Sequence, residues 1–191
     1  MTRGIRIAAR CEAVLLGLLT VTGLYLNWFY RPSSVRVYFF GDTKGPQTSI
    51  RVAHGIRALH VVCSIGFVWV GVGLAGMCIA GAFRGTRVQS RATTAAVGGF
   101  TVLAFGASFT GHLLPWDQLA LRAVTVGSNM RGLWQAAFSD QIRFVLIGNR
   151  EISQGTLRGW FLVHAFVLPP LLAATFIVSF FRKAGSGEAD V

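Results

Sequence analysis

The stretch 156–181, TLRGWFLVHAFVLPPLLAATFIVSFF, decides the fold class of this chain. It carries one charged residue, Arg158, close to its start. As a helix of about 26 residues rising about 1.5 Å each, it exceeds the ~30 Å hydrocarbon core of a bilayer. The stretch therefore predicts a transmembrane helix. It holds one ionisable side chain at membrane depth, His164, and such a group indicates a functional site.

Three further apolar blocks of spanning length, 11–30, 55–82 and 93–114, precede this stretch. The chain has 191 residues, of which 53% are hydrophobic and only 13% charged, a balance too apolar for a typical soluble domain. The first block is too long for a signal peptide, and no cleavage site follows it. We therefore expect an all-α membrane protein, a single domain over residues 1–191 that forms a bundle of four transmembrane helices.

The segment 119–152 differs from the four blocks because charged and apolar residues mix in it. Its basic residues are Arg122, Arg131, Arg143 and Arg150. This pattern predicts one or two short amphipathic helices that lie on the outer surface between the third and fourth spans. The segment is a candidate cover for a membrane pocket, a docking face for a partner, or a plain connector. Residues 184–191 are expected to form a flexible tail.

The net charge of +11 comes largely from basic residues at the ends of the predicted spans. Those on one side are Arg3, Arg6, Arg10, Arg84, Arg87, Arg91, Arg182 and Lys183. Those on the opposite side are Arg31, Arg36, Lys44 and Arg51. The excess on the first side predicts that both termini lie in the cytoplasm. We expect the membrane to be a bacterial-type inner membrane. Because the charges flank apolar spans, they indicate contact with a lipid bilayer rather than with nucleic acid.

A second histidine, His60, lies on the block 55–82 at a depth that matches that of His164. Haem b with two axial ligands needs two neutral imidazoles on opposite sides of the ring, and imidazole is a common ligand of haem iron. Arg57 is one turn before His60 and is a candidate partner for a haem propionate. The sequence thus favours a haem-binding bundle with His60 and His164 as iron ligands. Two unrelated core histidines are the alternative.

The three cysteines, Cys11, Cys63 and Cys78, lie within apolar blocks and do not form the pattern of a disulfide framework. Cys63 and Cys78 fit small packing residues of a helix bundle. Cys11, near the start of the first block, is a less favoured candidate for covalent attachment of a haem.

Two segments carry a resemblance to a known family: SFTGHLLPWDQLALRAVTVGSNM at 108–130 and TLRGWFLVHAFVLPP at 156–170. They resemble the cytochrome b of quinol:cytochrome c oxidoreductases, and most closely the short, four-helix form found in b6f-type complexes. The exit of the first block at Phe29-Tyr30-Arg31-Pro32 and the Arg57-x-x-His60 entry fall where that family has them. The resemblance covers nearly the whole chain.

The departures from that family concern a second haem. The family places two histidines, 14 or 15 residues apart, on each of the second and fourth helices, so that two haems stack across the bilayer. Here the position 14 after His60 is Leu74. The positions 14 and 15 after His164 are Val178 and Ser179. Neither helix has a second histidine ligand.

The glycines of the first and third blocks follow the same division. The family uses glycine pairs spaced 14 apart so that each porphyrin edge can approach the backbone. Gly23 and Gly111 match the members of these pairs nearest the outer haem, whereas the inner positions hold Ala9 and Val97. The resemblance therefore implies one haem b, near the outer face, unless an inner haem is bound by ligands other than histidine.

Two further histidines, His54 and His112, are predicted to lie near the outer surface. Interfacial hydrogen bonding, proton transfer from a quinol, and ligation of a further haem shared with a partner all remain open for them.

The resemblance implies a cytochrome b subunit that exchanges electrons between a quinone or menaquinone pool and a partner at the outer face. The region Pro115-Trp116-Asp117-Gln118, with His112, is the candidate quinone site. The family completes that site with a three-helix part that carries a Pro-Glu-Trp-Tyr element, which this chain lacks. We therefore expect a three-helix partner subunit, together with an iron–sulfur protein, a c-type cytochrome or another redox subunit. A haem-bearing conduit without its own quinone site, or a membrane anchor, are the alternatives.

Overall fold

The computed structural model describes residues 3–30, 32, 47–83, 91–128 and 153–181. Three long helices come first, α1 (Arg3–Phe29), α2 (Gln47–Phe83) and α3 (Arg91–Leu113), followed by the shorter α4 (Gln118–Ser128). The last long helix consists of α6 (Gln154–Leu162), a π-helical turn η1 (Val163–Val167) and α7 (Leu168–Phe181).

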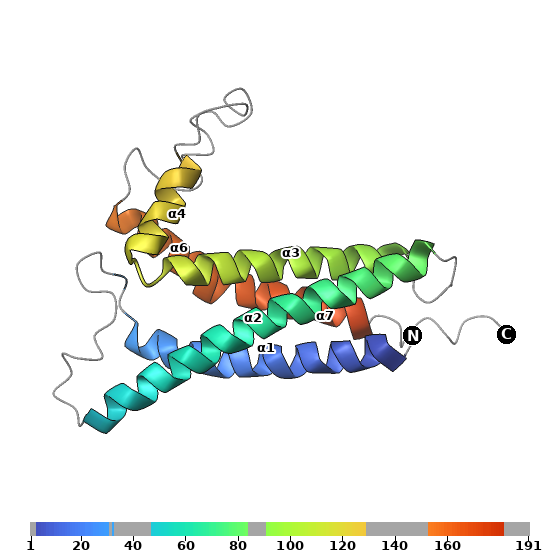
Figure 1. Ribbon diagram of the computed structural model, residues 1–191, viewed down its shortest axis with the longest axis horizontal. Helices are drawn as coiled ribbons and strands as arrows, with labels where there is room; N and C mark the ends of the chain where they lie inside the picture. Colours follow the sequence, from blue (N-terminus) through green and yellow to red (C-terminus); the bar gives the residue numbers. More distant parts are fainter. Residues whose placement is uncertain (1–2, 31, 33–46, 84–90, 129–152, 182–191) are drawn as a thin grey trace.

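The long helices run side by side along one axis, so that the start of α1 and the end of α7 lie at one end of the bundle (Figure 1). We call this the N-terminal end. α4 and α6 lie at the opposite end, which we call the α4 end (Figure 1). Within the described residues, four helices are long and apolar enough to cross a membrane. The expected all-α bundle of four transmembrane helices is therefore confirmed.

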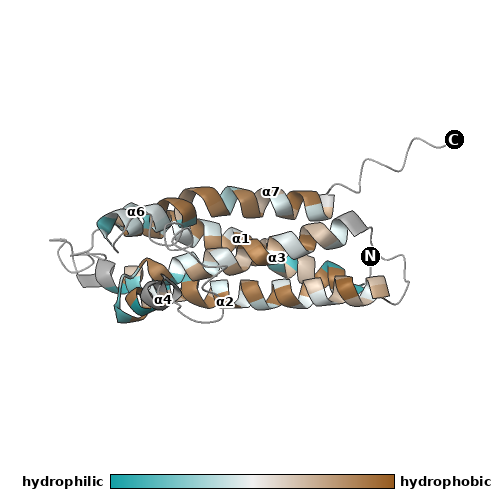
Figure 2. Ribbon diagram, turned by 90° about the horizontal axis from the view of Figure 1, so that it is seen from above, coloured by the Kyte–Doolittle hydropathy of each residue, from teal (hydrophilic) through white to brown (hydrophobic). Residues whose placement is uncertain are grey.

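The outer faces of the helices carry large apolar side chains, as expected of surfaces in contact with lipid. Trp28 is 85% exposed, and Trp69 and Val102 are also exposed. Hydrophobic residues extend along the helices, whereas hydrophilic residues gather around α4 and α6 (Figure 2). Because exposure of so much apolar surface to water is unfavourable, the apolar exterior fits a protein embedded in a lipid bilayer.

Two helices are longer than the apolar blocks that predict them. α1 begins at Arg3 instead of residue 11, and α2 begins at Gln47 instead of residue 55. Hydropathy marks the part of a helix that can cross the hydrocarbon core, whereas polar flanks continue the helix beyond it.

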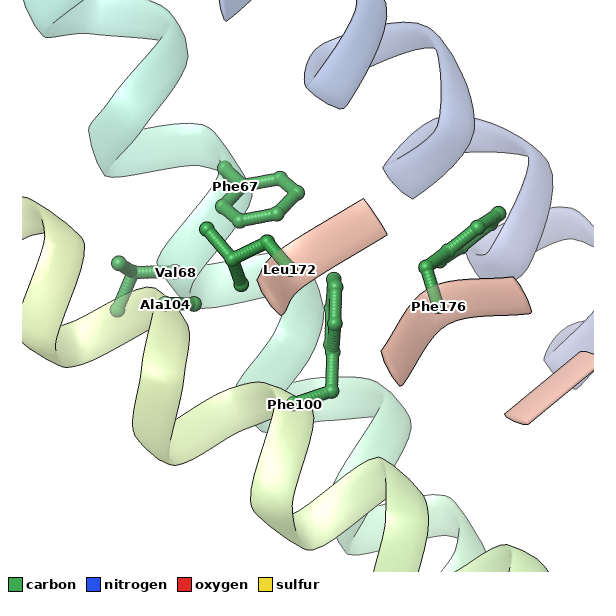
Figure 3. Packing of buried hydrophobic residues seen from close by; sticks show 6 residues of the cluster. All are labelled: Phe67, Val68, Phe100, Ala104, Leu172 and Phe176. Atoms are coloured by element: carbon green, nitrogen blue, oxygen red, sulfur yellow. The ribbon is translucent and has the colours of Figure 1, made fainter. Parts of the chain in front are cut away.

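The middle of the bundle is held together by packed aromatic rings. Phe67 of α2 and Phe100 of α3 meet edge to face at 5.3 Å, and Phe100 lies 5.8 Å from Phe176 of α7. Val68, Ala104 and Leu172 complete this cluster (Figure 3). Tilted and edge-to-face pairs at these distances stabilise a core beyond the area they bury.

The α4 end is stabilised by a hydrogen bond between helix ends and by a second hydrophobic cluster. The Tyr30 hydroxyl donates to the backbone oxygen of Leu114 at 3.0 Å, which joins the end of α1 to the end of α3. Tyr30, Leu114 and Leu157 form a buried cluster against which Trp116 packs.

The amphipathic segment predicted at 119–152 begins as a helix, since α4 covers Gln118–Ser128, while 129–152 lies outside the described residues. The predicted tail at 184–191 lies outside them too, as do Arg31, Arg36, Lys44, Arg84, Arg87, Arg131, Arg143, Arg150, Arg182 and Lys183.

Candidate haem-binding site

The structure brings His60 and His164 together between α2 and η1. Their ring centroids are 6.4 Å apart and the ring planes make an angle of 74°. Both side chains are partly buried. When two imidazoles bind the same metal ion, the ion lies about 2 Å from one nitrogen of each ring. The 6.4 Å between the ring centroids therefore leaves space for a single ion.

The hydrogen bonds of His60 determine which of its nitrogens carries the proton. His60 Nδ1 lies 2.8 Å from the Thr22 hydroxyl. That hydroxyl directs its own proton to the backbone oxygen of Leu18, at 2.7 Å. Since a hydroxyl has one proton to donate, it accepts from His60, whose Nδ1 is then protonated. The Nε2 lone pair of His60 is thereby left for a metal ion.

The same tautomer follows for His164. Its Nδ1 lies 3.0 Å from the backbone oxygen of Ala107, which can only accept, and 3.1 Å from the Thr110 hydroxyl. Nδ1 therefore donates, and Nε2 keeps its lone pair. A backbone carbonyl that fixes ring and tautomer is a typical support for a metal-binding histidine.

A glycine lies beside each imidazole. A Cβ atom on Gly23 would stand 3.4 Å from Cε1 of His60, and one on Gly111 would stand 2.9 Å from Cε1 of His164. The second distance is shorter than real Cβ contacts allow, so any larger residue at 111 would displace His164. In the structure these two glycines therefore provide room for the imidazoles themselves.

The two histidines fit haem better than a bare metal ion. Among the described residues, no group of three or more His, Cys, Asp or Glu side chains could hold a metal ion. Metal sites built from protein ligands alone usually need three or four. Two imidazoles with free Nε2 atoms match the axial ligand set of a haem, whose macrocycle supplies the other four nitrogens.

The π-helical turn η1 positions His164. The Leu168 N–H bonds to the backbone oxygen of Val163, five residues earlier, which widens the helix by one residue at this point. Pro169 and Pro170 follow directly; proline has no N–H and its ring clashes with the carbonyl four residues before it. The widened turn relieves that clash, and such turns are frequent at functional sites.

The candidate quinone-site residues lie in the turn between α3 and α4. Trp116 has a φ of 53°, a left-handed conformation that is strained for tryptophan. Asp117 Oδ1 accepts from the backbone N–H of Ala120 at 2.8 Å and so caps α4. Pro115 is partly buried, whereas Gln118 is exposed.

The remaining predicted residues differ in their exposure. His112 is exposed, and its Nδ1 bonds to the backbone oxygen of Ser108 at 2.8 Å. His54 is also exposed, while Arg57 is partly buried one turn from His60. Cys11 is exposed, and Cys63 and Cys78 are buried free cysteines.

Three of the four positions where the resemblance would require an inner haem are filled by buried apolar side chains, whereas at the fourth Val178 is exposed and Ser179 is buried. Leu74 and Val97 are both 0% exposed and form a cluster with Ile5 and Cys78. Ala9 is buried as well. The inner histidine position of α2 and the inner glycine position of α3 thus contribute to a hydrophobic core.

Sequence reasoning missed the hydroxyls that support the histidines. Thr22 precedes Gly23, and Thr110 precedes Gly111, so each predicted glycine belongs to a Thr-Gly pair. A hydroxyl beside a glycine, repeated on two spans, was a usable signal. The π-helical turn was missed as well, although the Pro169-Pro170 pair announces an irregular helix.

Comparisons with known proteins identify the family to which this chain belongs. The family model described as Cytochrome b/b6/petB matches residues 9–184. The chain is similar to cytochrome b6 of Porphyra purpurea, with 29% identity over 86% of this chain and 75% of the relative. Cytochrome b6 of Bigelowiella natans is 31% identical over the same shares.

A solved structure titled hyperthermophilic respiratory Complex III is similar in fold, with a TM-score of 0.74 and 16% identity. The match covers 95% of this chain and 47% of that one, so the chain spans about half the length of its structural relative. Since the family model matches most of the chain, this protein belongs to the cytochrome b/b6 family of membrane-bound, haem-binding electron-transport proteins.

Proposed function

We propose that this chain is a cytochrome b subunit with one haem, which exchanges electrons between the quinone pool and a redox partner at the outer membrane face. The observation that carries the proposal is the His60–His164 pair, with both Nδ1 atoms engaged and a ring separation of 6.4 Å. Haem b supplies a one-electron carrier when it is bound.

The chain's own residues prepare the site for that carrier. Thr22 and Ala107 orient the imidazoles and engage both Nδ1 atoms, so that each Nε2 is left for the iron. Arg57, one turn from His60, is our candidate for a propionate partner. The surrounding apolar helices exclude water, which favours the electrically neutral histidine ligands.

The packed N-terminal half supports the limit to one haem. Leu74 and Val97 occupy the positions of an inner ligand and an inner glycine and are fully buried. A porphyrin there would have to displace this core. With no inner relay, a second electron has no short path across the bilayer, so we propose a simple link between quinone and partner instead of a bifurcated cycle.

The orientation follows from charge. Arg3, Arg6 and Arg10 are exposed at the N-terminal end. Because clustered arginines favour the cytoplasmic side, the histidine pair and the α4 end face outward. We place the protein in a bacterial-type inner membrane with both termini in the cytoplasm.

The turn 115–118, with His112, is our candidate for part of a quinone site, completed by a three-helix partner subunit. A conduit without its own quinone site is the second candidate. It is favoured by the structural use of Asp117, whose carboxylate caps α4, and by the exposure of His112 on the outer side.

One experiment separates these candidates. The native complex is purified, a quinol analogue is added, and haem reduction is followed by absorbance with and without a quinone-competitive inhibitor. We expect quinol to reduce the haem and the inhibitor to shift its spectrum. Reduction that only a partner's donor can drive, with no inhibitor shift, would favour the conduit. A His164→Ala variant that kept a bis-imidazole spectrum would disprove the ligand assignment.

A further inference from the structure

Glu12 lies buried inside the bundle. It is the one acidic residue within the four described membrane-spanning helices. Its side chain is 0% exposed, and neither carboxyl oxygen has a hydrogen-bond partner among the residues that the structure describes. A carboxyl group in such surroundings costs free energy, so a merely structural side chain at this position would be apolar.

The neighbouring helices make room for this carboxyl group. Oε1 of Glu12 lies 3.1 Å from the point where a Cβ on Gly71 of α2 would stand, so glycine provides the space it occupies. The Thr101 hydroxyl of α3 stands 3.7 Å from the same point. That hydroxyl directs its proton to the backbone oxygens of Val97 and Gly71 and keeps acceptor capacity for an acid O–H.

No described basic group faces Glu12. Arg3, Arg6 and Arg10 are spaced three and four residues apart and share one face of α1, whereas Glu12 projects from the opposite face. Between His60 and the end of α2 at Phe83, the titratable groups are Cys63 and Cys78. α3 has none between Arg91 and His112, and α7 has none.

We propose that Glu12 is a proton-binding site linked to the oxidation state of the haem. This inference rests on the proposed haem between His60 and His164. Glu12 lies ten residues from Thr22 on the same helix, about 15 Å along its axis. Across an apolar interior, a charge at that distance still acts on another, so the oxidised haem favours the Glu12 carboxylate and the reduced haem favours the acid.

The step balances in charge. Iron(III) takes one electron from a quinol, or from an electrode, and becomes iron(II). The Glu12 carboxylate takes one proton from the aqueous phase and becomes the acid. Proton binding at Glu12 and reduction of the haem favour each other, because linkage is reciprocal. Lowering the pH, which protonates Glu12, must therefore raise the midpoint potential of the haem.

The test is a redox titration of the haem in the purified native complex across the neutral pH range. We expect the wild-type midpoint potential to fall as pH rises, by at most about 59 mV per unit, the value for one proton per electron. Glu12→Gln keeps the shape of the side chain and should remove most of this slope. Cys78→Ser is the matched control and should leave it unchanged.

A second measurement uses the wild-type protein, so it does not depend on whether a variant folds. The reduced-minus-oxidised infrared spectrum of the wild type should show a carboxylic acid C=O band that appears on reduction and shifts in D2O. Absence of that band, or a pH slope that survives in Glu12→Gln with normal haem content, would overturn the inference. Absence of the haem itself would instead contradict the proposed function.

Discussion

The two proposed ligands differ in the number of acceptors that support them. His60 relies on the Thr22 hydroxyl, whereas His164 has both the Thr110 hydroxyl and the backbone oxygen of Ala107. A side-chain acceptor can be removed by mutation, but a backbone acceptor remains. The two sites should therefore respond unequally to loss of their threonines.

Thr22→Val should lower haem affinity by about 10–100-fold, the usual cost of losing such a support, because His60 then loses its acceptor. Thr110→Val should cost less, since Ala107 still holds His164. Haem content after titration with hemin measures both. Thr22→Ser should restore binding, and Thr20→Val, whose exposed hydroxyl bonds to the backbone oxygen of Leu16, is the control. Equal losses in both valine variants would contradict the assignment.

Glycine 111 is the tightest point of the site. Gly111→Ala places a methyl group 2.9 Å from His164 Cε1 and should abolish or strongly weaken haem binding, whereas Gly23→Ala, at 3.4 Å, should weaken it moderately. Gly106→Ala on α3 meets nothing within 4 Å and should leave the haem spectrum unchanged. The absorbance spectrum of the purified complex ranks the three variants. An unaffected Gly111→Ala variant would disprove the close packing against His164.

At this scale the sequence singled out the proposed ligands but not the residues that surround them. His60, His164, Gly23 and Gly111 stand out because histidines are rare in apolar spans and the glycines match a family pattern. Thr22 and Thr110 do not stand out, because threonine is common in membrane helices and its role depends on which way it faces. Glu12 was visible as a lone acidic residue within a span, but its complete burial required the structure.

Two irregular elements shape the site. The π-helical turn Val163–Val167 rotates the residues before Pro169 relative to those after it. The left-handed Trp116 lies in the turn after α3, from which α4 leaves the bundle at a sharp angle (Figure 1). Helix propensity cannot predict either feature, because both arise from contacts and from proline sterics. The spans themselves were predictable, since length and hydropathy decide them.

Asp117 provides a test at the scale of elements. If its role is to cap α4, Asp117→Asn should behave like the wild type, because asparagine is an equally good cap. Asp117→Ala should lose about 1 kcal/mol of stability, seen as a lower midpoint of thermal unfolding in detergent. If Asp117→Asn keeps its stability but loses quinol-dependent haem reduction, the carboxylate also has a chemical role, and capping alone does not explain it.

At the scale of the whole molecule, the bundle is divided along its axis. The α4 end holds paired histidines, glycines and hydroxyls. The N-terminal half holds a hydrophobic core around Leu74 and Val97, and it also holds the buried Glu12. The absence of inner histidines could be read from the sequence. The packing of Leu74 and Val97 into a buried core could not be read from the sequence, because it depends on how the helices approach one another.

Leu74→Ala tests that division. Since Leu74 is fully buried, the variant should lose about 2–5 kcal/mol of stability and yet retain its haem. Ile79→Ala, on the exposed side of the same helix, should change little. Thermal unfolding and haem content are measured together. Loss of haem from Leu74→Ala at a temperature where the bundle stays folded would mean that the N-terminal half takes part in cofactor binding.

The stoichiometry of haem tests the central claim most directly. The native complex is purified, haem b is quantified from the pyridine haemochrome spectrum, and the amount of this chain is measured by quantitative mass spectrometry. The account predicts one haem b per chain. Two haems per chain would contradict it, because the core around Leu74 and Val97 would then have to open for a second ring, and none would leave a scaffold.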